Sequence, residues 1–442
     1  MAPRFGTDGI RGAAGSELTP DLVRALGRAA VAALGTDVPF LIARDPRESG
    51  PELEAAITDG IARAGGTVRL LGMLPTPGLA ASCAATGAAG VMISASHNVF
   101  SDNGVKLFEP GGRKLRDETE AAVEAALAAD DRPEAESAGS ITTVPNAADA
   151  YVAHLVMAAG GGSPFTGLSV VVDAANGAAS EVGPRALREL GATVEVLHAE
   201  PNGTNINAGC GSTYPDVVAE AVRAMEADCG LAFDGDADRI VAVDASGAIV
   251  DGDHILAILA IDLQARDRLR NDAIATTVMA NLGLVRALEP RGIDVIVTPV
   301  GDRHVLAAME DHDLVLGGEQ SGHIIESEYA VTGDGPLTGI LVLAAMVRSG
   351  RSLAELASVV VKYPQVLRNV RVANRDGLDA ATEFWAAVAG VEADLAGEGR
   401  VLVRPSGTEP VVRVMVEAAS TDAAERFADA LVDALTGALG AG

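Results

Sequence analysis

Short apolar segments alternate with helical segments three times along most of this chain. Segments 39–43, 168–173 and 314–316 have the length and composition of buried strands, and residues with helical spacing stand between such segments. Strand–helix–strand order predicts parallel pairing, because a parallel neighbour is reached through a crossover connection. We therefore expect three α/β units that vary one plan.

The chain also shows where these units end. Residues 130–146 are rich in Asp, Glu, Ser and Pro and have no long apolar face, and from about residue 360 strands surround helices in an α+β pattern. A chain of 442 residues is too long for one hydrophobic core. We expect α/β domains at 1–143, 144–247 and 248–359 and a smaller α+β domain at 360–442.

Individual elements follow from capping residues and apolar spacing. Thr19 can cap a helix that begins at Pro20. The apolar pattern predicts further helices at 117–129 and 148–158. It predicts further strands at 67–71, 90–93, 193–197, 230–233, 275–278, 295–298, 367–372, 401–404 and 411–417.

Composition limits the possible partners. The formal net charge is -28, so the chain repels phosphate backbones and anionic lipid surfaces, and we expect neither nucleic acid nor membrane as a partner. Lysine occurs only at positions 106, 114 and 362, and arginine fills the other basic positions. An acidic, lysine-poor and alanine-rich chain is what a salt-adapted cytoplasm favours.

Cysteine usage and apolar runs indicate the compartment. Cys83, Cys210 and Cys229 are widely spaced and form no CxxC pair, which argues against a disulfide framework or a zinc site. No uncharged apolar run reaches the ~18 residues of a membrane span. The N-terminus has no charged segment followed by an apolar one. We expect a cytoplasmic protein.

Two loops carry the residues of a reactive centre. Residues 94–98 place Ser96 beside His97, although a lone Ser–His pair is also compatible with a polar turn. Residues 234–239 alternate Asp234, Asp236 and Asp238 after an apolar strand. Three carboxylates so close repel one another unless a cation lies among them, so a hard divalent metal is expected, and a solvated acidic turn is the alternative. A calcium EF-hand is excluded, because Arg239 stands at the sixth position and alanine at the twelfth.

Two further loops suit binding of a sugar and of a phosphate group. In residues 317–323, Glu319 and Ser321 could bond vicinal hydroxyls, although a plain glycine-rich loop has the same composition. In residues 404–413, arginines, hydroxyls and exposed backbone would hold a phosphate, and a β-turn with an incidental arginine is the alternative. The predicted phosphate-binding residues are Arg404, Ser406, Gly407, Thr408 and Arg413.

In their order along the chain, these loops and the opening segment 5–12 resemble the α-D-phosphohexomutase superfamily. The resemblance runs from residue 5 to about 418. It implies four domains around a central cleft, with mixed sheets and one loop from each domain. It further implies that Ser96 is carried as phosphoserine and binds one Mg²⁺ per active site together with Asp234, Asp236 and Asp238.

The resemblance also implies a reaction. The phosphoryl group of Ser96 would pass to a sugar monophosphate, and the bisphosphorylated intermediate would turn over and return its other phosphate. A sugar bisphosphate would serve as activator. Arg11 and Arg239 would neutralise charge on the transferring group. Lys106 and His97 are the candidates to move protons, and lysine suits this role because it can lose its proton where arginine cannot.

Three short segments favour the amino-sugar branch of the superfamily: 205–213, 301–303 and 332–335, together with Gln320 in the sugar loop. We therefore expect interconversion of glucosamine 6-phosphate and glucosamine 1-phosphate, on the route to UDP-N-acetylglucosamine. The alternative is the phosphomannomutase/phosphoglucomutase branch. A metal-dependent phosphatase and a silent sugar-phosphate binder are more distant alternatives, and either a monomer or a homodimer is compatible with the sequence.

One residue departs from the pattern. Val99 stands where the superfamily usually has proline after His-Asn. The loss of proline should loosen the turn behind Ser96 without removing the nucleophile.

Overall fold

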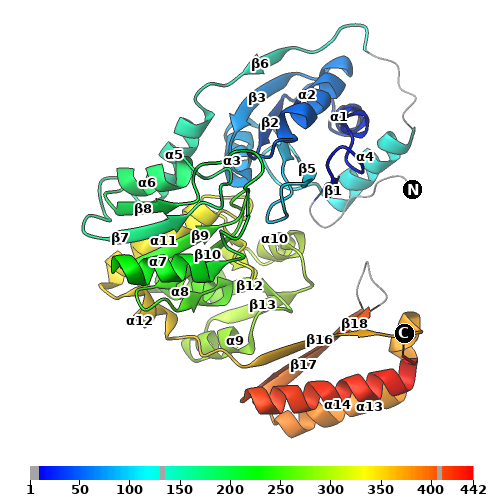
Figure 1. Ribbon diagram of the computed structural model, residues 1–442, viewed down its shortest axis with the longest axis vertical. Helices are drawn as coiled ribbons and strands as arrows, with labels where there is room; N and C mark the ends of the chain where they lie inside the picture. The colour runs from blue at the N-terminus through cyan, green and yellow to red at the C-terminus, as the bar shows by residue number, and fades with distance from the viewer. Residues whose placement is uncertain (1–8, 130–134, 406–410, 442) are drawn as a thin grey trace. The chain divides into compact units, whose positions relative to one another are not determined.

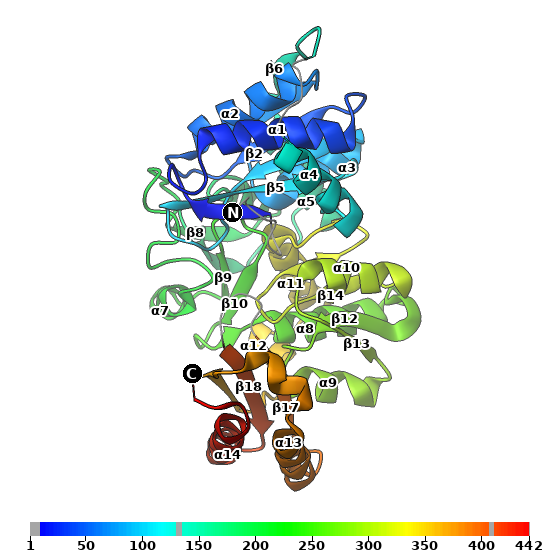
Figure 2. The same cartoon turned by 90° about the vertical axis from the view of Figure 1, so that its right-hand side faces the viewer.

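The structure is a computed structural model that describes residues 9–129, 135–405 and 411–441. Its contacts divide the chain into two compact units. One unit comprises Met1–Thr277 and Ile296–Ser358, and the other comprises Val278–Val295 and Val359–Gly442. Figures 1 and 2 show the helices and strands of both units in two views.

The first sheet has six strands in the order β1-β5-β4-β2-β3-β6 and mixes parallel and antiparallel pairs. β4, β2, β3 and β6 run parallel, whereas β5 is antiparallel to both β4 and β1. The strands are β1 (Ile10–Ala13), β2 (Phe40–Arg44), β3 (Val68–Met73), β4 (Ala89–Ile93), β5 (Asp102–Phe108) and β6 (Ile141–Thr143). The helices are α1 (Pro20–Leu34), α2 (Gly50–Arg63), α3 (Thr76–Thr86) and α4 (Asp117–Ala129).

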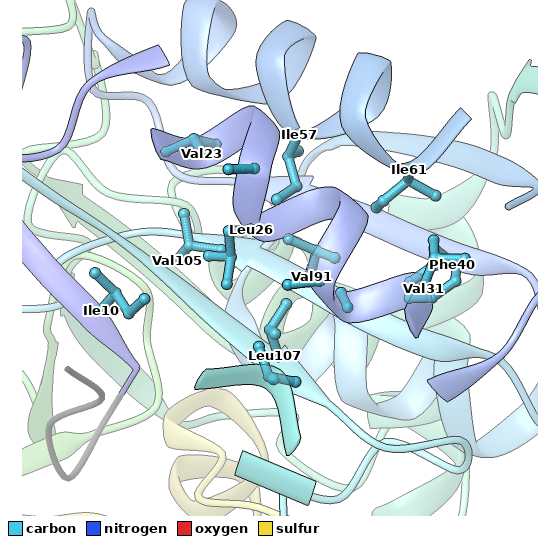
Figure 3. Packing of buried hydrophobic residues seen from close by; sticks show 14 of the residues in the cluster. Ile10, Val23, Leu26, Val31, Phe40, Ile57, Ile61, Val91, Val105 and Leu107 are labelled. Carbon is cyan, nitrogen blue, oxygen red and sulfur yellow. The ribbon is translucent and has the colours of Figure 1, made fainter. Parts of the chain in front are cut away.

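The core of this domain lies between its helices and the sheet. α1 begins where expected, because the Thr19 hydroxyl accepts a hydrogen bond from the Leu22 amide at 3.3 Å. Apolar residues of α1 and α2 then face the strands. Figure 3 shows side chains of the helices directed toward those of the sheet, among them Val23, Leu26, Ile57, Phe40, Val91, Val105 and Leu107.

The second sheet has five strands in the order β11-β10-β9-β7-β8. β8, β7 and β9 are parallel, and β10 turns back antiparallel to β9. The strands are β7 (Ser169–Asp173), β8 (Thr193–Leu197), β9 (Cys229–Phe233), β10 (Ile240–Asp244) and β11 (Ile249–Val250). The helices are α5 (Ala147–Ala158), α6 (Val182–Glu189) and α7 (Pro215–Met225).

The third sheet has the order β13-β12-β14-β15, with β12 parallel to β14 and β14 antiparallel to β15. The strands are β12 (Ala273–Thr277), β13 (Asp294–Thr298), β14 (Leu316–Gly318) and β15 (Ile324–Glu326). The α-helices are α8 (Gly252–Ala265), α9 (Leu282–Leu288), α10 (Asp302–Asp311), α11 (Gly335–Ser349) and α12 (Leu353–Ala357). The short 3-10 helices are η1 (Arg270–Asp272) and η2 (Glu289–Arg291).

The C-terminal sheet has the antiparallel order β16-β18-β17 and carries two helices packed against each other. The elements are β16 (Gln365–Arg371), β17 (Gly399–Pro405), β18 (Val411–Ala418), η3 (Arg375–Ala380), α13 (Thr382–Leu395) and α14 (Thr421–Leu439). Glu417 accepts hydrogen bonds from Asn281 Nδ2 at 3.2 Å and the Leu282 amide at 3.0 Å. These bonds tie the start of α9 to this sheet.

The expected fold class, three α/β parts with mixed sheets and a smaller C-terminal α+β part, is confirmed. The four boundaries at 1–143, 144–247, 248–359 and 360–442 stay a prediction. Within the described residues, no helix has both the length and the apolar character needed to cross a membrane.

The structure differs from the sequence prediction at one predicted strand and adds one strand that was not predicted. The strand expected at 314–316 begins only at Leu316 and runs through Gly317 and Gly318, because the two glycines pair in parallel with β12. A Cβ on Gly317 would lie 2.6 Å from Met309 Sδ, so glycine lets the strand pass α10 closely. No element was predicted for Asp102–Phe108, which forms strand β5.

The closest approach of α1 and α2 generates a stability prediction. A methyl group on Gly60 would collide with the carbonyl oxygen of Arg24, and one on Gly27 would lie 2.6 Å from the carbonyl oxygen of Ile57. We expect Gly60→Ala to destabilise the fold by about 1–3 kcal/mol because the helices must separate. Gly390 in α13 has open space around its Cβ position. The matched control Gly390→Ala is expected to stabilise by about 0.5–1 kcal/mol. Thermal unfolding measures both, and an unchanged Gly60→Ala melting temperature contradicts the prediction.

Candidate functional site

Ser96 lies directly after the central strand β4, in a loop that directs its hydroxyl away from that strand's own sheet. The residue is fully buried and has a φ of 52°, in the left-handed region that non-glycine residues rarely adopt. Its Oγ donates to Asp234 Oδ2 at 2.5 Å and lies 3.2 Å from His97 Nδ1. The hydroxyl therefore points at the loop that follows β9.

The loop between β9 and β10 holds the three aspartates together. Asp234, Asp236 and Asp238 are buried, and one carboxylate oxygen from each lies within 4.8 Å of the others. Burial, followed by the charges of Asp238 and Asp236, raises the pKa of Asp234 well above its usual value. The sequence thus predicted a cluster that could hold a metal ion, and the structure brings it together.

Lys106 supplies the positive charge nearest to this cluster. It lies on β5 opposite Met92 of β4 and is only 2% exposed. Its Nζ is 2.7 Å from Asp236 Oδ2 and 3.2 Å from Asp238 Oδ2. Burial alone would raise the pKa of Asp238, but Lys106 and then His323 outweigh it and hold that pKa well below its usual range.

The carboxylate cluster keeps unused acceptor capacity. Within the part of the chain that the structure describes, Asp236 Oδ1 and Asp238 Oδ1 are buried and receive no hydrogen bond. Buried oxygens without a donor are costly, and a bound cation would satisfy them. All-oxygen ligands suit a hard divalent ion, so these residues fit the metal expected from their spacing.

His97 lies beside the Ser96 hydroxyl, and the charges of two arginines act on its ring. Arg239 Nη1 lies 3.2 Å from His97 Nδ1, and the Arg239 amide donates to Asp234 Oδ1 at 3.1 Å. Burial, then the charges of Arg239 and Arg11, lowers the pKa of His97. This shift favours the neutral form of the His97 ring.

The loop that carries Glu319 and Ser321 joins β14 to β15. The Ile240 amide donates to the Gly322 carbonyl oxygen at 3.1 Å, which attaches this loop to β10. Glu319 Oε1 accepts from the Gly301 amide at 3.2 Å, whereas Ser321 is exposed. Both predicted sugar-binding residues thus lie on a loop anchored beside the aspartates.

A cavity of about 540 Å³ is lined mainly by residues of the segment 109–118 and of α10. Among its lining residues are Lys114 and Asp302, whose Nζ and Oδ2 are 2.5 Å apart. Asp302 Oδ2 is in turn 3.3 Å from His323 Nε2, and His323 Nδ1 is 3.8 Å from Asp238 Oδ2. Charged side chains therefore connect the cavity to the carboxylate cluster.

The predicted phosphate-binding arginines lie in the second unit and face one another across two strands. Arg404 of β17 pairs directly with Arg413 of β18. Burial, then the charge of Arg413, lowers the pKa of Arg404. Ser406, Gly407 and Thr408 lie outside the described residues. Two adjacent guanidinium groups provide the multiple donors that a phosphate group requires.

Sequence reasoning missed two groups that contact the cluster. Thr76, the first residue of α3, donates a hydrogen bond from Oγ1 to Asp236 Oδ2 at 2.5 Å. No local sequence motif marks this residue. His323 contacts Asp238 from the sugar loop. The motif of that loop contains His323, but its spacing gives no sign that the ring faces the aspartates.

A second mixed group lies behind the aspartate loop. Asp173, His198 and Cys210 offer ligand atoms within 4.8 Å of one another. However, Asp173 accepts hydrogen bonds from the Ala175 and Gly211 amides at 2.9 and 3.0 Å. Burial raises the pKa of the Cys210 thiol to about 12, so the thiol stays protonated. We assign this group to holding the loops together.

Family models of the phosphoglucomutase/phosphomannomutase family match almost the whole chain. They are described as alpha/beta/alpha domains I, II and III and a C-terminal domain, and they match residues 2–134, 149–247, 251–363 and 367–434 respectively.

Curated relatives are similar over their full length. A phosphoglucosamine mutase of Saccharopolyspora erythraea is 50% identical over 440 residues, covering 98% of this chain and 99% of the relative. One of Kineococcus radiotolerans is 50% identical over 446 residues, covering 98% of each chain.

Solved structures share the fold. A phosphoglucomutase/phosphomannomutase family protein of Burkholderia thailandensis superposes with a TM-score of 0.83 at 26% identity, covering 99% of this chain and 98% of that one. An Aspergillus fumigatus N-acetylphosphoglucosamine mutase, solved with GlcNAc-6P and magnesium, has a TM-score of 0.68 at 20% identity, covering 98% and 96%. The second likeness concerns the fold alone.

The open carboxylate oxygens generate a prediction about metal binding. Addition of Mg²⁺ to the metal-free protein should raise its melting temperature, because an ion that binds only the folded state stabilises by about 2.7 kcal/mol at a hundred times its Kd. Asp236→Asn should lose most of this rise. Asp59→Asn alters an acid in a surface ion pair with Arg24 and should retain it. A rise of equal size in all three proteins refutes the site.

Proposed function

Because the chain belongs to the phosphoglucomutase/phosphomannomutase family, we propose that it interconverts glucosamine 6-phosphate and glucosamine 1-phosphate. It is an isomerase of the phosphohexomutase type. The observation that carries the mechanism is the 2.5 Å contact between Ser96 Oγ and the Asp234 carboxylate. A nucleophile beside an acidic metal cluster suits phosphoryl transfer, in which positioning and charge neutralisation do most of the catalysis.

Ser96 would be the carrier of the phosphoryl group. The Ser96 phosphate would bind with Asp234, Asp236 and Asp238 around one Mg²⁺, which when bound supplies charge neutralisation for the transferring group. In the first transfer, the sugar hydroxyl oxygen bonds to phosphorus, the bond from phosphorus to Ser96 Oγ breaks, and the hydroxyl proton passes to a base. Arg11 and Arg239 would offset the negative charge that remains.

Lys106 and His97 would move the protons. The lowered pKa of His97 favours its unprotonated ring, which would take up the proton of the sugar hydroxyl. The ammonium group of Lys106 contacts Asp236 and Asp238 and would donate a proton to the departing serine oxygen. In the second transfer the roles reverse, because the other phosphate of the sugar bisphosphate returns to Ser96.

The remaining loops would bind the parts of the sugar phosphate that do not react. Glu319 and Ser321 would bond the sugar hydroxyls, and Arg404, Ser406, Gly407, Thr408 and Arg413 would hold the second phosphate. A sugar bisphosphate would serve as activator by supplying the first phosphoryl group to Ser96. We further propose a cytoplasmic protein, monomeric or homodimeric, whose partner is a hexosamine phosphate.

Phosphorylation of Ser96 is directly measurable. Intact-mass analysis after incubation with glucosamine 1,6-bisphosphate should show a phosphorylated fraction that Ser96→Ala abolishes, together with mutase turnover. Ser101→Ala changes an exposed serine of the same loop and should leave both the phosphorylated fraction and the mutase turnover unchanged. A Ser96→Ala protein with undiminished turnover overturns the role of Ser96.

The substrate is tested by a panel. The value of kcat/KM should be at least about tenfold higher for glucosamine 1-phosphate than for glucose 1-phosphate or mannose 1-phosphate, because a site that hydrogen-bonds one polar substituent of its substrate discriminates strongly against analogues with another. Equal or higher efficiency on glucose 1-phosphate would assign the chain to the phosphomannomutase/phosphoglucomutase activity. Steady release of inorganic phosphate without isomerised sugar would identify a phosphatase.

A further inference from the structure

Two polar side chains outside the reacting groups converge on the backbone of the Ser96 loop. One is Arg47, at the turn between β2 and α2, which is fully buried although it carries a charge. The other is Asn207, in the segment between β8 and α7, which is also buried. A buried guanidinium is expensive unless its donors and its charge are satisfied, so its contacts indicate what it is there to hold.

Arg47 donates hydrogen bonds to carbonyl oxygens of the serine loop. Nη2 donates to Ser96 O at 3.0 Å and Asn98 O at 2.9 Å, and Nη1 donates to Asp102 O at 3.0 Å and to Val99 O. One planar group thus holds both ends of the loop. A lysine has a single nitrogen and cannot reproduce this arrangement.

The counter-charge of Arg47 belongs to the same network. Arg47 Nε lies 2.9 Å from Asp45 Oδ2, which also accepts from Ser94 Oγ at 2.6 Å. Ser94 Oγ in turn accepts from the Ser96 amide at 3.0 Å. The amide and the carbonyl of Ser96 are therefore both fixed by one chain of hydrogen bonds.

Asn207 reaches the same carbonyl oxygens from the second sheet's side. Its side-chain Nδ2 donates to Ser96 O at 2.8 Å and to Asn98 O at 3.0 Å. Its backbone amide donates to Ala175 O at 2.9 Å. Gly235 of the aspartate loop completes the contact, because a Cβ there would lie 2.6 Å from Ser96 O and 2.8 Å from Asn207 Nδ2. Asn207 thereby sets the distance between the serine loop and the aspartate loop.

We propose that Arg47 and Asn207 are positioning residues that hold Ser96 Oγ in register with Asp234. Ser96 has a left-handed backbone conformation, which is strained for a residue with a side chain and persists only when the surroundings impose it. Release of the loop carbonyls would let the backbone relax and turn the hydroxyl away from the aspartates. A shift of about 1 Å can slow a reaction by about a hundredfold. The proposal rests on the proposed mutase function.

The experiment compares Asn207→Ala and Arg47→Lys with the native chain in the mutase assay. We expect kcat to fall by about 10- to 100-fold in each while KM for the sugar phosphate changes by less than about threefold, because neither residue is placed in the sugar or phosphate loops. The rate at which a sugar bisphosphate phosphorylates Ser96, followed by intact mass, should fall by the same factor as kcat.

Two controls separate positioning from loss of stability. Val222→Ala removes buried packing in the core of the second sheet and should lower the melting temperature while kcat stays native. Asn202→Ala changes an exposed asparagine of the same segment, whose Oδ1 accepts hydrogen bonds from the amide and the hydroxyl of Thr204, and should alter neither the melting temperature nor kcat.

The outcomes are distinct. A native kcat in Asn207→Ala, or a decrease no larger than that of Val222→Ala at equal melting temperature, overturns the proposal. If Arg47→Lys does not fold, Asn207→Ala alone decides, because Asn207 carries no charge to be compensated. If a sugar bisphosphate phosphorylates Ser96 of the native chain but amino-sugar phosphates are not isomerised, the proposed mutase function is overturned. The phosphorylation rates of the native chain and the variants then still test the positioning role.

Discussion

Mutual repulsion among Asp234, Asp236 and Asp238 is the constraint around which the rest of the site is arranged. Two unit charges 4 Å apart near a protein surface interact by about 4 kcal/mol, so three buried carboxylates cannot share a loop without compensation. Lys106 compensates two of them directly. Thr76 and the Arg239 amide each donate a hydrogen bond to one of the carboxylates. Where an acceptor oxygen has no donor, the site is open for a cation.

Sheet topology brings these compensating groups together. β5 runs antiparallel beside β4. Lys106 of β5 therefore lies next to the end of β4, from which the loop with Ser96 begins. The hairpin of β9 and β10 then presents the aspartates to both. Residues that are more than a hundred positions apart in sequence thus meet at strand ends, which is where α/β folds usually build their sites.

The sequence predicted the parts that depend on local patterns. The capped helix at Pro20, the strand at 193–197 and the aspartate cluster all follow from spacing and residue type. Strand β5 was missed because its polar start, from Asp102, resembles a loop, and its place is decided by pairing with β4. Thr76, Arg47 and Asn207 were also missed. Their roles come from contacts across loops, which no local period encodes.

The two arginines that face each other in the C-terminal sheet have a consequence for ligand choice. Arg404 and Arg413 occupy one rung of the β17–β18 ladder, and their repulsion contributes to the lowered pKa of Arg404. A dianion placed against both guanidinium groups cancels this repulsion, whereas a monoanion leaves part of it in place. A phosphate group held by this pair, as proposed, would therefore be favoured as a dianion over a singly charged anion.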